Sequence, residues 1–439
     1  MRPLQCLLIL LIVLLPASPF ATTFPVTKTA DTNDGVCDPD CSLREAIDAA
    51  NTNPGADDVP VPAGLYLLTL GQLTITDDVS IAGADQATTI IDGNVNLPGR
   101  VFEIQSDTVV EISSVTIQNG GSPDYQYDPL LIGGGILNSG DLALTDTTVR
   151  RNRATDFLFQ GIGGGIFNDT GTLSLYNTTV SGNGVAGDGG GIFNRSGTVN
   201  LTDSTVMSNG AGSAGGIYNG GILTLTNSTV SGNSALNDYF SGSGGGIWNR
   251  GDMTLTNSTV SGNQAGYYDS PYLATGRGGG ILNSGAGTAR MINGTVTGNR
   301  AYESGGGISN FNALSLTGTI VADNVVDNCG GSVDSLGYNL ADDTSCGFTQ
   351  LTDLVVADAM LGPLQDNGGP TETHDLLPGS PAIDAGSANC PPPATDQRGV
   401  SRPQDAGCDI GAVEFVPEPH NAPTLVAGAA LLALLYRRR

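Results

Sequence analysis

The chain is short of positive charge and of aromatic side chains. Its single lysine is Lys28, and 17 lysines and arginines stand against 43 aspartates and glutamates, a formal net charge of −26. This balance disfavours nucleic acid and anionic membrane surfaces as partners, because both repel an acidic protein. Aromatic residues make up only 5% of the chain, and 64 glycines are too many for an ordinary globular core. A hydrophobic fraction of 39% nevertheless argues against disorder.

In place of a conventional core, one phrase recurs seven times between Gly133 and Asn310. Each copy has a glycine cluster, an Ile, an Asn two residues later, alternating apolar residues, a Val and a second Asn. The copies are 25 to 34 residues apart, which is the length of one supersecondary unit. The first Asn column is Asn138, Asn168, Asn194, Asn219, Asn249, Asn283 and Asn310, and the second is Asn152, Asn183, Asn209, Asn233, Asn263, Asn299 and Asn324.

The alternation of apolar and polar residues inside each copy indicates three short strands separated by turns. Such a unit cannot bury its apolar face alone, but stacked copies build continuous Ile, Leu and Val ladders. The sequence therefore predicts an all-β fold, a right-handed parallel β-helix. Asn suits the bends, because it tolerates left-handed backbone geometry and its amide can bond to the Asn of the next coil. The segment from Val59 to Gly120 has similar alternating apolar residues without the clean phrase, and predicts irregular coils.

Both ends of the chain carry segments typical of export. Arg2, the apolar run Leu4 to Leu15 and small residues ending near Ala21 predict a secretory signal peptide. At the other end, Pro417-Glu418-Pro419, an apolar stretch from Ala422 to Tyr436 and a final Arg437-Arg438-Arg439 resemble the PEP-CTERM sorting signal of Gram-negative bacteria. This resemblance implies transient insertion of the tail into the inner membrane and processing by an exosortase. The alternative is a plain single-span tail anchor.

Six cysteines follow the signal peptide and fall into three local couples. Closeness in the chain favours the pairs Cys37–Cys41, Cys329–Cys346 and Cys390–Cys408. A metal site is the rival interpretation, but no histidine lies near any couple and there is no Cys-X-X-Cys motif. Disulfides that staple the two ends of the solenoid fit an oxidising destination.

The N-terminal end begins with a short predicted helix. Cys41-Ser42-Leu43-Arg44-Glu45-Ala46-Ile47 resembles the CSLREA module of bacterial surface proteins. Ser42 and Glu45 predict a capping box for a helix from Leu43 to about Asn51, which would plug the first coil. Just before it, oxygen-bearing residues crowd together and suggest either a calcium site or a solvated acidic turn, although their spacing does not fit an EF-hand. These residues are Asp31, Asn33, Asp34, Asp38 and Asp40.

The other end changes character after Gly362, where the chain becomes rich in proline and loses strand periodicity. Phrases such as Asp366-Asn367-Gly368-Gly369-Pro370-Thr371 and Asp396-Gln397-Arg398-Gly399 resemble the choice-of-anchor Q domain, which implies a module placed before a surface anchor. We expect it to form an irregular, disulfide-stapled cap over the far end of the solenoid. His374 is expected to satisfy backbone hydrogen bonds. An internal ion-pair network is expected from Arg398, Arg402, Asp409 and Glu414.

The glycine-rich phrases resemble those of polymorphic outer-membrane and other bacterial β-helix repeats. The outward columns of the predicted strands show no carboxylate pair of the kind that glycoside hydrolysis needs. We therefore expect no enzyme, but a structural or adhesive protein of the cell surface or extracellular matrix, associated with polysaccharide. The alternative is a polysaccharide lyase or glycoside hydrolase of the pectate-lyase-like class, since that class shares the fold.

Ligand binding is expected where the repeats vary in length, between the second Asn and the next glycine cluster. Inserts at this point should emerge along one edge. Their aromatic residues suit stacking on sugar rings, although they could also fold back as small satellite clusters. These candidates are Phe157, Phe159, Tyr239, Phe240, Tyr267, Tyr268 and Tyr272.

The predicted organisation follows from these segments. It is a signal peptide (1–21), a CSLREA-type cap (22–58), irregular coils (59–120), regular repeats (121–345), a choice-of-anchor Q-like cap (346–415) and a sorting tail (416–439).

Overall fold

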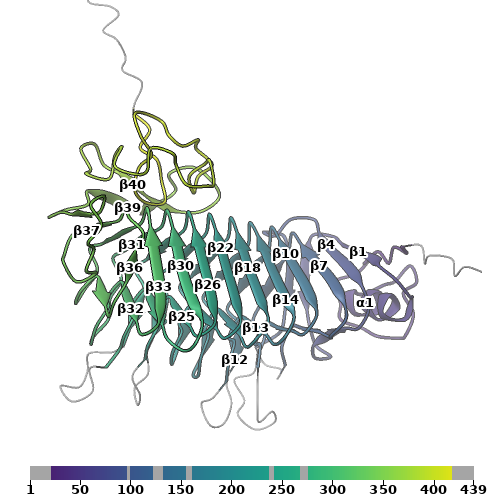
Figure 1. Ribbon diagram of the computed structural model, residues 1–439. Helices are drawn as coiled ribbons and strands as arrows, with labels where there is room; N and C mark the ends of the chain where they lie inside the picture. The colour runs from purple at the N-terminus through teal and green to yellow at the C-terminus, as the bar shows by residue number, and fades with distance from the viewer. Residues whose placement is uncertain are drawn as a thin grey trace, which may run out of the picture. The chain divides into compact units, whose positions relative to one another are not determined.

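The computed structural model describes residues 21–95, 99–121, 132–154, 161–236, 242–266 and 275–417 (Figure 1). These residues form one helix and a long series of short strands. The chain divides into two compact units. The N-terminal unit is Met1–Gly187 with Gly191–Val199, and the C-terminal unit is Asp188–Gly190 with Asn200–Arg439. The division falls inside β18 (Thr198–Thr202), and each unit is described by itself.

The N-terminal unit is a stack of parallel strands in three long sheets. Each strand pairs in register with the equivalent strand one coil away. Sheet A holds β1 (Asp57–Val61), β4 (Val79–Gly83), β7 (Val109–Ser113), β10 (Asp141–Thr145) and β14 (Thr172–Tyr176). Sheet B holds β2 (Gly64–Leu67), β5 (Thr89–Asp92), β8 (Thr116–Gln118), β11 (Thr148–Arg150) and β15 (Thr179–Ser181). Sheet C holds β3 (Leu73–Ile75), β6 (Phe102–Ile104), β9 (Ile136–Asn138), β13 (Ile166–Asn168) and β17 (Ile192–Asn194), and β12 (Arg153–Ala154) pairs with β16 (Gly184–Val185).

The C-terminal unit repeats the same three sheets. Sheet A holds β22 (Ile222–Thr226), β26 (Asp252–Thr256), β30 (Thr288–Ile292), β33 (Ala313–Thr317) and β36 (Asp334–Ser335). Sheet B holds β19 (Thr205–Met207), β23 (Thr229–Ser231), β27 (Thr259–Ser261), β31 (Thr295–Thr297), β34 (Ile320–Ala322), β37 (Leu340–Ala341) and β38 (Leu354–Val355). Sheet C holds β21 (Ile217–Asn219), β25 (Ile247–Asn249), β29 (Ile281–Asn283), β32 (Ile308–Asn310) and β35 (Cys329–Gly330). The short strands β20 (Gly210–Ala211), β24 (Ser234–Ala235) and β28 (Gln264–Ala265) also stack.

Period-two apolar residues explain why these strands stack. Leu142 pairs with Leu173 and Leu144 with Leu175 across β10 and β14, and all four side chains are buried. Like side chains one above another leave no gap between coils, so each coil completes the core of its neighbour. The predicted parallel β-helix is confirmed.

Two buried ladders of asparagine amides hold successive coils together. Asn138 Nδ2 donates to Asn168 Oδ1 at 2.7 Å, and Asn233 Nδ2 donates to Asn263 Oδ1 at 3.0 Å, so the expected coil-to-coil amide bonds are confirmed. The expected left-handed geometry belongs to a third column, in the turn between sheets A and B. It has φ between 45° and 52° at Asp146, Asn177, Asp203, Asn227, Asn257 and Asn293.

The N-terminal cap is the helix α1 (Leu43–Thr52), which packs on β1 and β3. Its predicted capping box is confirmed, because the Ser42 side chain accepts from Glu45 N–H and the Glu45 carboxylate accepts from Ser42 N–H. The helix buries Ala46 and Ile47 against the first coil. An apolar helix face thus closes this end of the core, as the sequence predicts.

The C-terminal module, residues 361–415, lies against the side of the coils and not only over their end. It begins with the hairpin β39 (Leu361–Gln365) and β40 (Thr373–Leu376). Hydrogen bonds join it to β23, β27 and β31 of sheet B. Its apolar core packs on Ile320, Ala322 and Leu340. Small Thr, Ser and Ala side chains make this outer face flat, so an irregular segment can pack closely on it.

All three predicted disulfides form: Cys37–Cys41, Cys329–Cys346 and Cys390–Cys408. Within the residues that the structure covers, no helix has the length and apolarity to span a membrane. Residues 1–20 of the predicted signal peptide and residues 418–439 of the predicted sorting tail lie outside the described residues.

Candidate functional site

The aromatic inserts predicted to bind a ligand lie outside the described residues. This holds for Phe157, Phe159, Tyr239, Phe240, Tyr267, Tyr268 and Tyr272.

The oxygen-bearing residues before α1 are spread over separate interactions. Asp31 receives hydrogen bonds from Arg44 Nε at 2.8 Å and from Leu70 N–H at 2.8 Å. Burial alone would raise the pKa of Asp31, but these hydrogen bonds lower it. Asp40 pairs with Lys28 at 3.0 Å. In the described part of the chain, no group of three His, Cys, Asp or Glu side chains is placed to hold a metal ion.

The other residues of this acidic loop shape its backbone. Asp34 Oδ1 accepts from Val36 N–H, Asp38 Oδ1 accepts from Asp40 N–H, and Asn33 Oδ1 accepts from Gly35 N–H. Each is a side chain bonded to the backbone two residues on, which is the geometry of a turn. The observed contacts are therefore those of a folded acidic loop.

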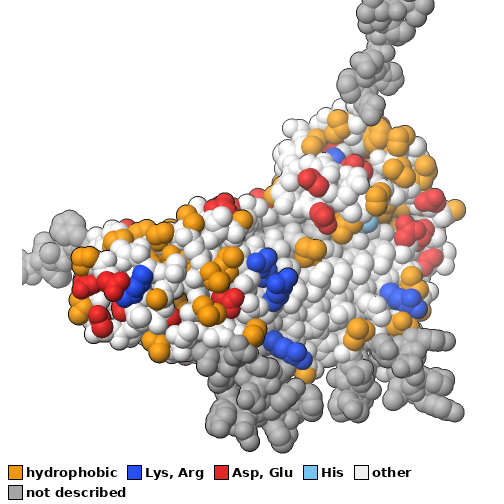
Figure 2. All heavy atoms as spheres, turned by 180° about the vertical axis from the view of Figure 1, so that it is seen from behind, with side chains coloured by type: hydrophobic (Ala, Val, Ile, Leu, Met, Phe, Trp, Pro, Cys, Tyr) orange, Lys and Arg blue, Asp and Glu red, His pale blue; other side chains and the backbone are white. Residues whose placement is uncertain are grey.

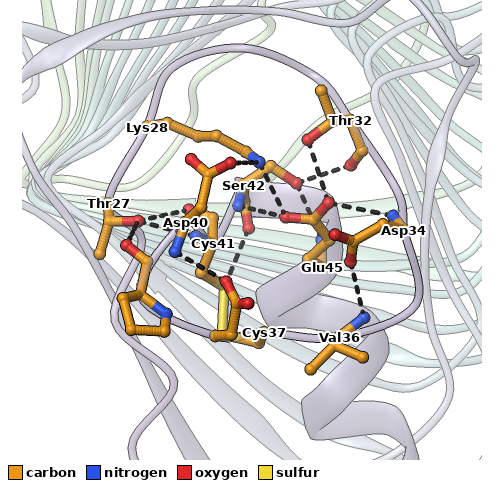
Figure 3. Close-up of a disulfide and its surroundings, with 12 residues drawn as sticks. Thr27, Lys28, Thr32, Asp34, Val36, Cys37, Asp40, Cys41, Ser42 and Glu45 are labelled. Atoms are coloured by element: carbon orange, nitrogen blue, oxygen red, sulfur yellow. Dashed lines mark hydrogen bonds and ion pairs between the residues drawn. A yellow bond between two sulfur atoms is a disulfide. The ribbon is translucent and has the colours of Figure 1, made fainter.

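Glu45 is the centre of this loop (Figure 3). Its buried carboxylate accepts from Ser42 N–H at 2.7 Å, Asp34 N–H at 3.2 Å and the Thr32 hydroxyl at 3.0 Å. Burial would raise the pKa of Glu45, but the hydrogen bonds outweigh it and lower the pKa to about 2. Together with the Arg44 bonds to the Gly71 and Gln72 carbonyls, these contacts tie the start of α1 to the loop before it and to the first coil.

The lone histidine of the C-terminal module has a structural environment too. His374 Nδ1 lies 2.7 Å from the Gly362 carbonyl, which can only accept, so Nδ1 carries the proton. Nε2 then accepts from the Ser261 hydroxyl at 2.8 Å. Burial lowers the pKa of His374, which favours this neutral form. The ring ties β40 to β27.

The expected ion-pair network of the C-terminal module is confirmed for Arg398, Arg402 and Glu414, whereas the Asp409 carboxylate accepts from backbone N–H groups of Asp384 and Phe415 instead. Arg402 and Glu414 form a buried pair, and Arg398 pairs with Asp396 and Asp375 at 2.8 Å each. Burial raises the pKa of Asp409 to about 6. These charged groups bind one another and the backbone, so they hold the module together.

A different column of side chains stands out on the outer face of sheet C. The middle residue of each Ile-X-Asn phrase points away from the core, because Ile and Asn on either side are buried. In the C-terminal unit this column begins with Tyr218 on β21 and Trp248 on β25, which pair in register. Both are half-buried. Sequence periodicity does not predict this column, because the Ile and Asn are constant and the residue between them varies.

Tyr218 and Trp248 form an ordered aromatic pair. Their ring centroids are 5.6 Å apart and the rings meet edge to face at 73°. Trp248 Nε1 donates to the Ser284 hydroxyl at 2.8 Å, which fixes the indole toward the next coil. Exposed Arg250 lies beside them, with Nη1 at 3.3 Å from the Tyr218 hydroxyl. The "aromatic face" is defined here as Tyr218, Trp248, Arg250 and Ser284.

One carboxyl group lies near this aromatic face. Asp188 joins the C-terminal unit through a parallel bridge to Ser213. Burial raises the pKa of Asp188, and the positive charge of Arg250 acts in the opposite direction. A half-buried acid thus lies within electrostatic range of Arg250, the exposed cation of the aromatic face.

Two further arginines of the C-terminal unit lie over aromatic rings. The Arg277 guanidinium is 5.2 Å from the Phe311 ring centroid and pairs with Glu303. Arg300 is 4.8 Å from the Tyr302 ring centroid. Figure 2 shows one face of the molecule, on which charged side chains gather only in small separate groups on a largely uncharged surface.

Three solved structures resemble this chain. The pectate lyase Pel9A is 15% identical, with 90% of this chain and 96% of that chain covered and a TM-score of 0.52. The PL6 family alginate lyase AlyGC is 13% identical, with 90% and 59% covered and a TM-score of 0.34. The A-module of the Azotobacter vinelandii mannuronan C-5 epimerase AlgE4 is 18% identical, with 74% and 83% covered and a TM-score of 0.29.

At this identity Pel9A shows a shared parallel β-helix fold alone, and we draw nothing from the other two. No model of a protein family and no curated protein sequence matches the chain.

Proposed function

We propose that this chain is an exported β-helix protein that binds extracellular polysaccharide on the aromatic face and does not cleave it. The observation that carries the proposal is the ordered pair of half-buried rings, Tyr218 and Trp248, beside the exposed Arg250. Aromatic rings offer an apolar surface to the C–H groups of a sugar, and the polar atoms at their edges bind its hydroxyls. The stacked strands of the repeat supply a rigid backbone beneath both rings.

Rigidity favours binding by this face. Trp248 is held by its bond to Ser284 and by the edge contact with Tyr218. A side chain that is already ordered loses little conformational entropy when a ligand arrives, so more of the contact energy appears as affinity. Adjacent strands are about 4.8 Å apart, so a glycan lying along the stack would contact several coils.

Export and surface attachment are part of the same proposal. The signal peptide, the PEP-CTERM-like residues with Pro417-Glu418-Pro419, and the resemblances to the CSLREA and choice-of-anchor Q modules support it. Three disulfides fit an oxidising compartment. The partner that processes the tail would be an exosortase, and the destination the surface or matrix of a Gram-negative bacterium.

Binding without cleavage is favoured by the chemistry around Asp188. Glycoside hydrolysis uses two carboxyl groups roughly 5 to 10 Å apart. Within the described residues, Arg250 is the charged side chain that acts on the pKa of Asp188, and no second carboxylate acts on it. The fold shared with a pectate lyase does not transfer that activity. The alternative, a lyase or hydrolase, is an outcome of the test below.

The test is size-exclusion chromatography of acidic and neutral bacterial polysaccharides incubated with the purified protein, with and without calcium. We expect unshortened polysaccharide to co-elute with the protein. Trp248→Ala should abolish co-elution, whereas Tyr176→Ala should not, because Tyr176 is an exposed aromatic on sheet A of the N-terminal unit and is not part of the aromatic face. Shortened polysaccharide would make the protein an enzyme, and absence of co-elution across the panel would overturn the proposal.

A further inference from the structure

Ion pairs divide the described cations of this protein into two groups. In a chain with 43 acidic residues, seven of the 13 described lysines and arginines are paired with a carboxylate, and Arg250 is one of the other six. Those pairs involve Lys28, Arg44, Arg100, Arg195, Arg277, Arg398 and Arg402. Arg250 forms no ion pair with any described carboxylate, although it is exposed and next to two aromatic rings.

We propose that the ligand of the aromatic face is an acidic glycan, and that Arg250 binds the carboxylate of a uronate residue while Trp248 stacks on a sugar ring. This inference rests on the proposed function, because it names the ligand class of the same site. A guanidinium presents two parallel N–H groups that match the two oxygens of a carboxylate, and such a charge-assisted pair is about twice as strong as a neutral hydrogen bond.

The surroundings of Arg250 leave its two parallel N–H groups able to bind a carboxylate. The Tyr218 hydroxyl lies 3.3 Å from Nη1 and orients one edge of the guanidinium. Asp188 attracts Arg250 at longer range but does not reach ion-pair distance. The guanidinium is therefore oriented and not neutralised, which is the condition that an incoming carboxylate needs.

The equivalent position in the N-terminal unit is arranged differently. Arg195 follows the Asn of β17 just as Arg250 follows the Asn of β25. Arg195 pairs with Asp169 at 3.0 Å, and the aromatic column beside it is buried. Arg195 is thus a matched control: the same residue type at the same repeat position, already bound to a carboxylate.

The net charge of −26 sets the expected salt dependence. A polyanion is repelled at long range by the protein as a whole, and salt screens that repulsion. Recognition of an acidic glycan must therefore come from the local contacts of Arg250 and Trp248. We expect the association rate of an acidic oligosaccharide to rise when NaCl is added, the opposite of a basic protein that binds a polyanion.

The test compares each acidic oligosaccharide with its own carboxyl-reduced form, which keeps the sugar backbone and loses only the charge. The probes are oligomers of galacturonate, mannuronate, guluronate and glucuronate. Affinities are measured by calorimetry for the wild-type protein, Arg250→Gln, Arg250→Lys and Arg195→Gln. We expect at least one uronate oligomer to bind about tenfold tighter than its reduced form, in line with a charge-assisted pair.

Arg250→Gln should abolish that tenfold preference, so that the uronate oligomer and its reduced form bind with similar affinity. Arg250→Lys should retain only part of it, because lysine keeps the charge and loses the fork. Arg195→Gln should behave as wild type. Equal binding of both forms, or a preference that survives Arg250→Gln, overturns the inference and leaves the proposed function standing. If neither form binds and Trp248→Ala changes nothing, both this inference and the proposed function are wrong.

Discussion

The two units use the same position of the repeat in opposite ways. In the N-terminal unit, Phe167 and Phe193 occupy the outer column of sheet C, stacked with their rings 5.3 Å apart and nearly parallel at 6°. Both are buried, at 2% and 9% exposure. In the C-terminal unit, Tyr218 and Trp248 occupy the same column edge to face and remain half-buried.

The difference teaches that scaffold and site are separable in this protein. The buried Ile and Asn columns are the same in both units and fix where the outer side chain stands. A phenylalanine there covers the sheet, whereas a tyrosine or tryptophan leaves a polar edge and a ring face at the surface. The two units therefore differ in the residue that varies between a constant Ile and a constant Asn.

The largest expected effect is on stability, in the N-terminal unit. Phe193→Ala removes a buried ring and its stacked contact, and should lower the free energy of unfolding by about 3 kcal/mol. Trp248→Ala should cost less, because its ring is only half-buried. Urea unfolding followed by circular dichroism measures both. Equal costs would mean that the two columns serve the same covering role.

The next effect should be equal in the two units. Asn168 donates to Asn194, and Asn249 donates to Asn283, at 3.0 and 2.8 Å. Replacing either donor by Ala leaves a buried carbonyl oxygen without its partner, at a cost of about 2 kcal/mol. The same unfolding experiment checks this, with Thr224→Ala on the half-exposed side of β22 as the control. A difference above about 1 kcal/mol would contradict a common scaffold.

A smaller effect is expected when the C-terminal column is made to resemble the N-terminal one. The double variant Tyr218→Phe and Trp248→Phe keeps two rings but removes the bonds to Arg250 and Ser284. We expect affinity for the bound polysaccharide to fall about tenfold, near 1.4 kcal/mol, with little change in unfolding free energy.

The reciprocal change, Phe193→Trp, provides the other side of that comparison. It should create no binding, since Arg195 is held by Asp169. Affinity electrophoresis in polysaccharide-containing gels measures both variants. A gain of binding in Phe193→Trp would show that the ring alone makes the site.

The smallest effect is a difference in acid sensitivity between the two ends. Burial lowers the pKa of His374, so the folded state binds its proton less readily than the unfolded state does. Its contribution is complete well above pH 6.5 and is lost as the pH falls from about 6.5 toward the lower pKa of the folded state. The pKa of Glu45 is lowered to about 2, so its contribution is lost only as the pH falls from about 4.5 toward 2.

Hydrogen exchange measures this difference directly. Between pH 7.5 and 5, β27 and β40 should lose protection while α1 does not, after correction for the intrinsic exchange rate. His374→Gln should remove the pH dependence at β40, because glutamine does not titrate. Simultaneous loss of protection at α1 and at β40 would show that His374 does not cause the pH dependence at β40.

The sequence predicted whatever is periodic or local. Repeating Ile, Val and Asn positions determine the coils, and the capping box of Ser42 and Glu45 needs only three residues of separation. The disulfides close short loops of 4, 17 and 18 residues. Each of these features depends on neighbours in the chain or in the repeat.

What escaped prediction depends on long-range contacts. Ser261 hydrogen-bonds to His374, 113 residues away in the chain, and Thr259 to Gln397, 138 residues away. No local sequence pattern therefore predicts that the C-terminal module packs on the side of the coils. The aromatic face was missed for another reason. Tyr218 and Trp248 differ from their counterparts in the other copies, and a search for repeated residues passes over those that vary.

The packing of the C-terminal module against the side of the coils has a mechanical consequence. Thr229, Thr259 and Thr295 lie on three successive strands of sheet B, and each hydrogen-bonds to the module. Tension that enters the chain beyond Pro417 reaches the module before it reaches the last coil. The load is then shared by bonds to three strands, instead of acting on the terminal coil alone.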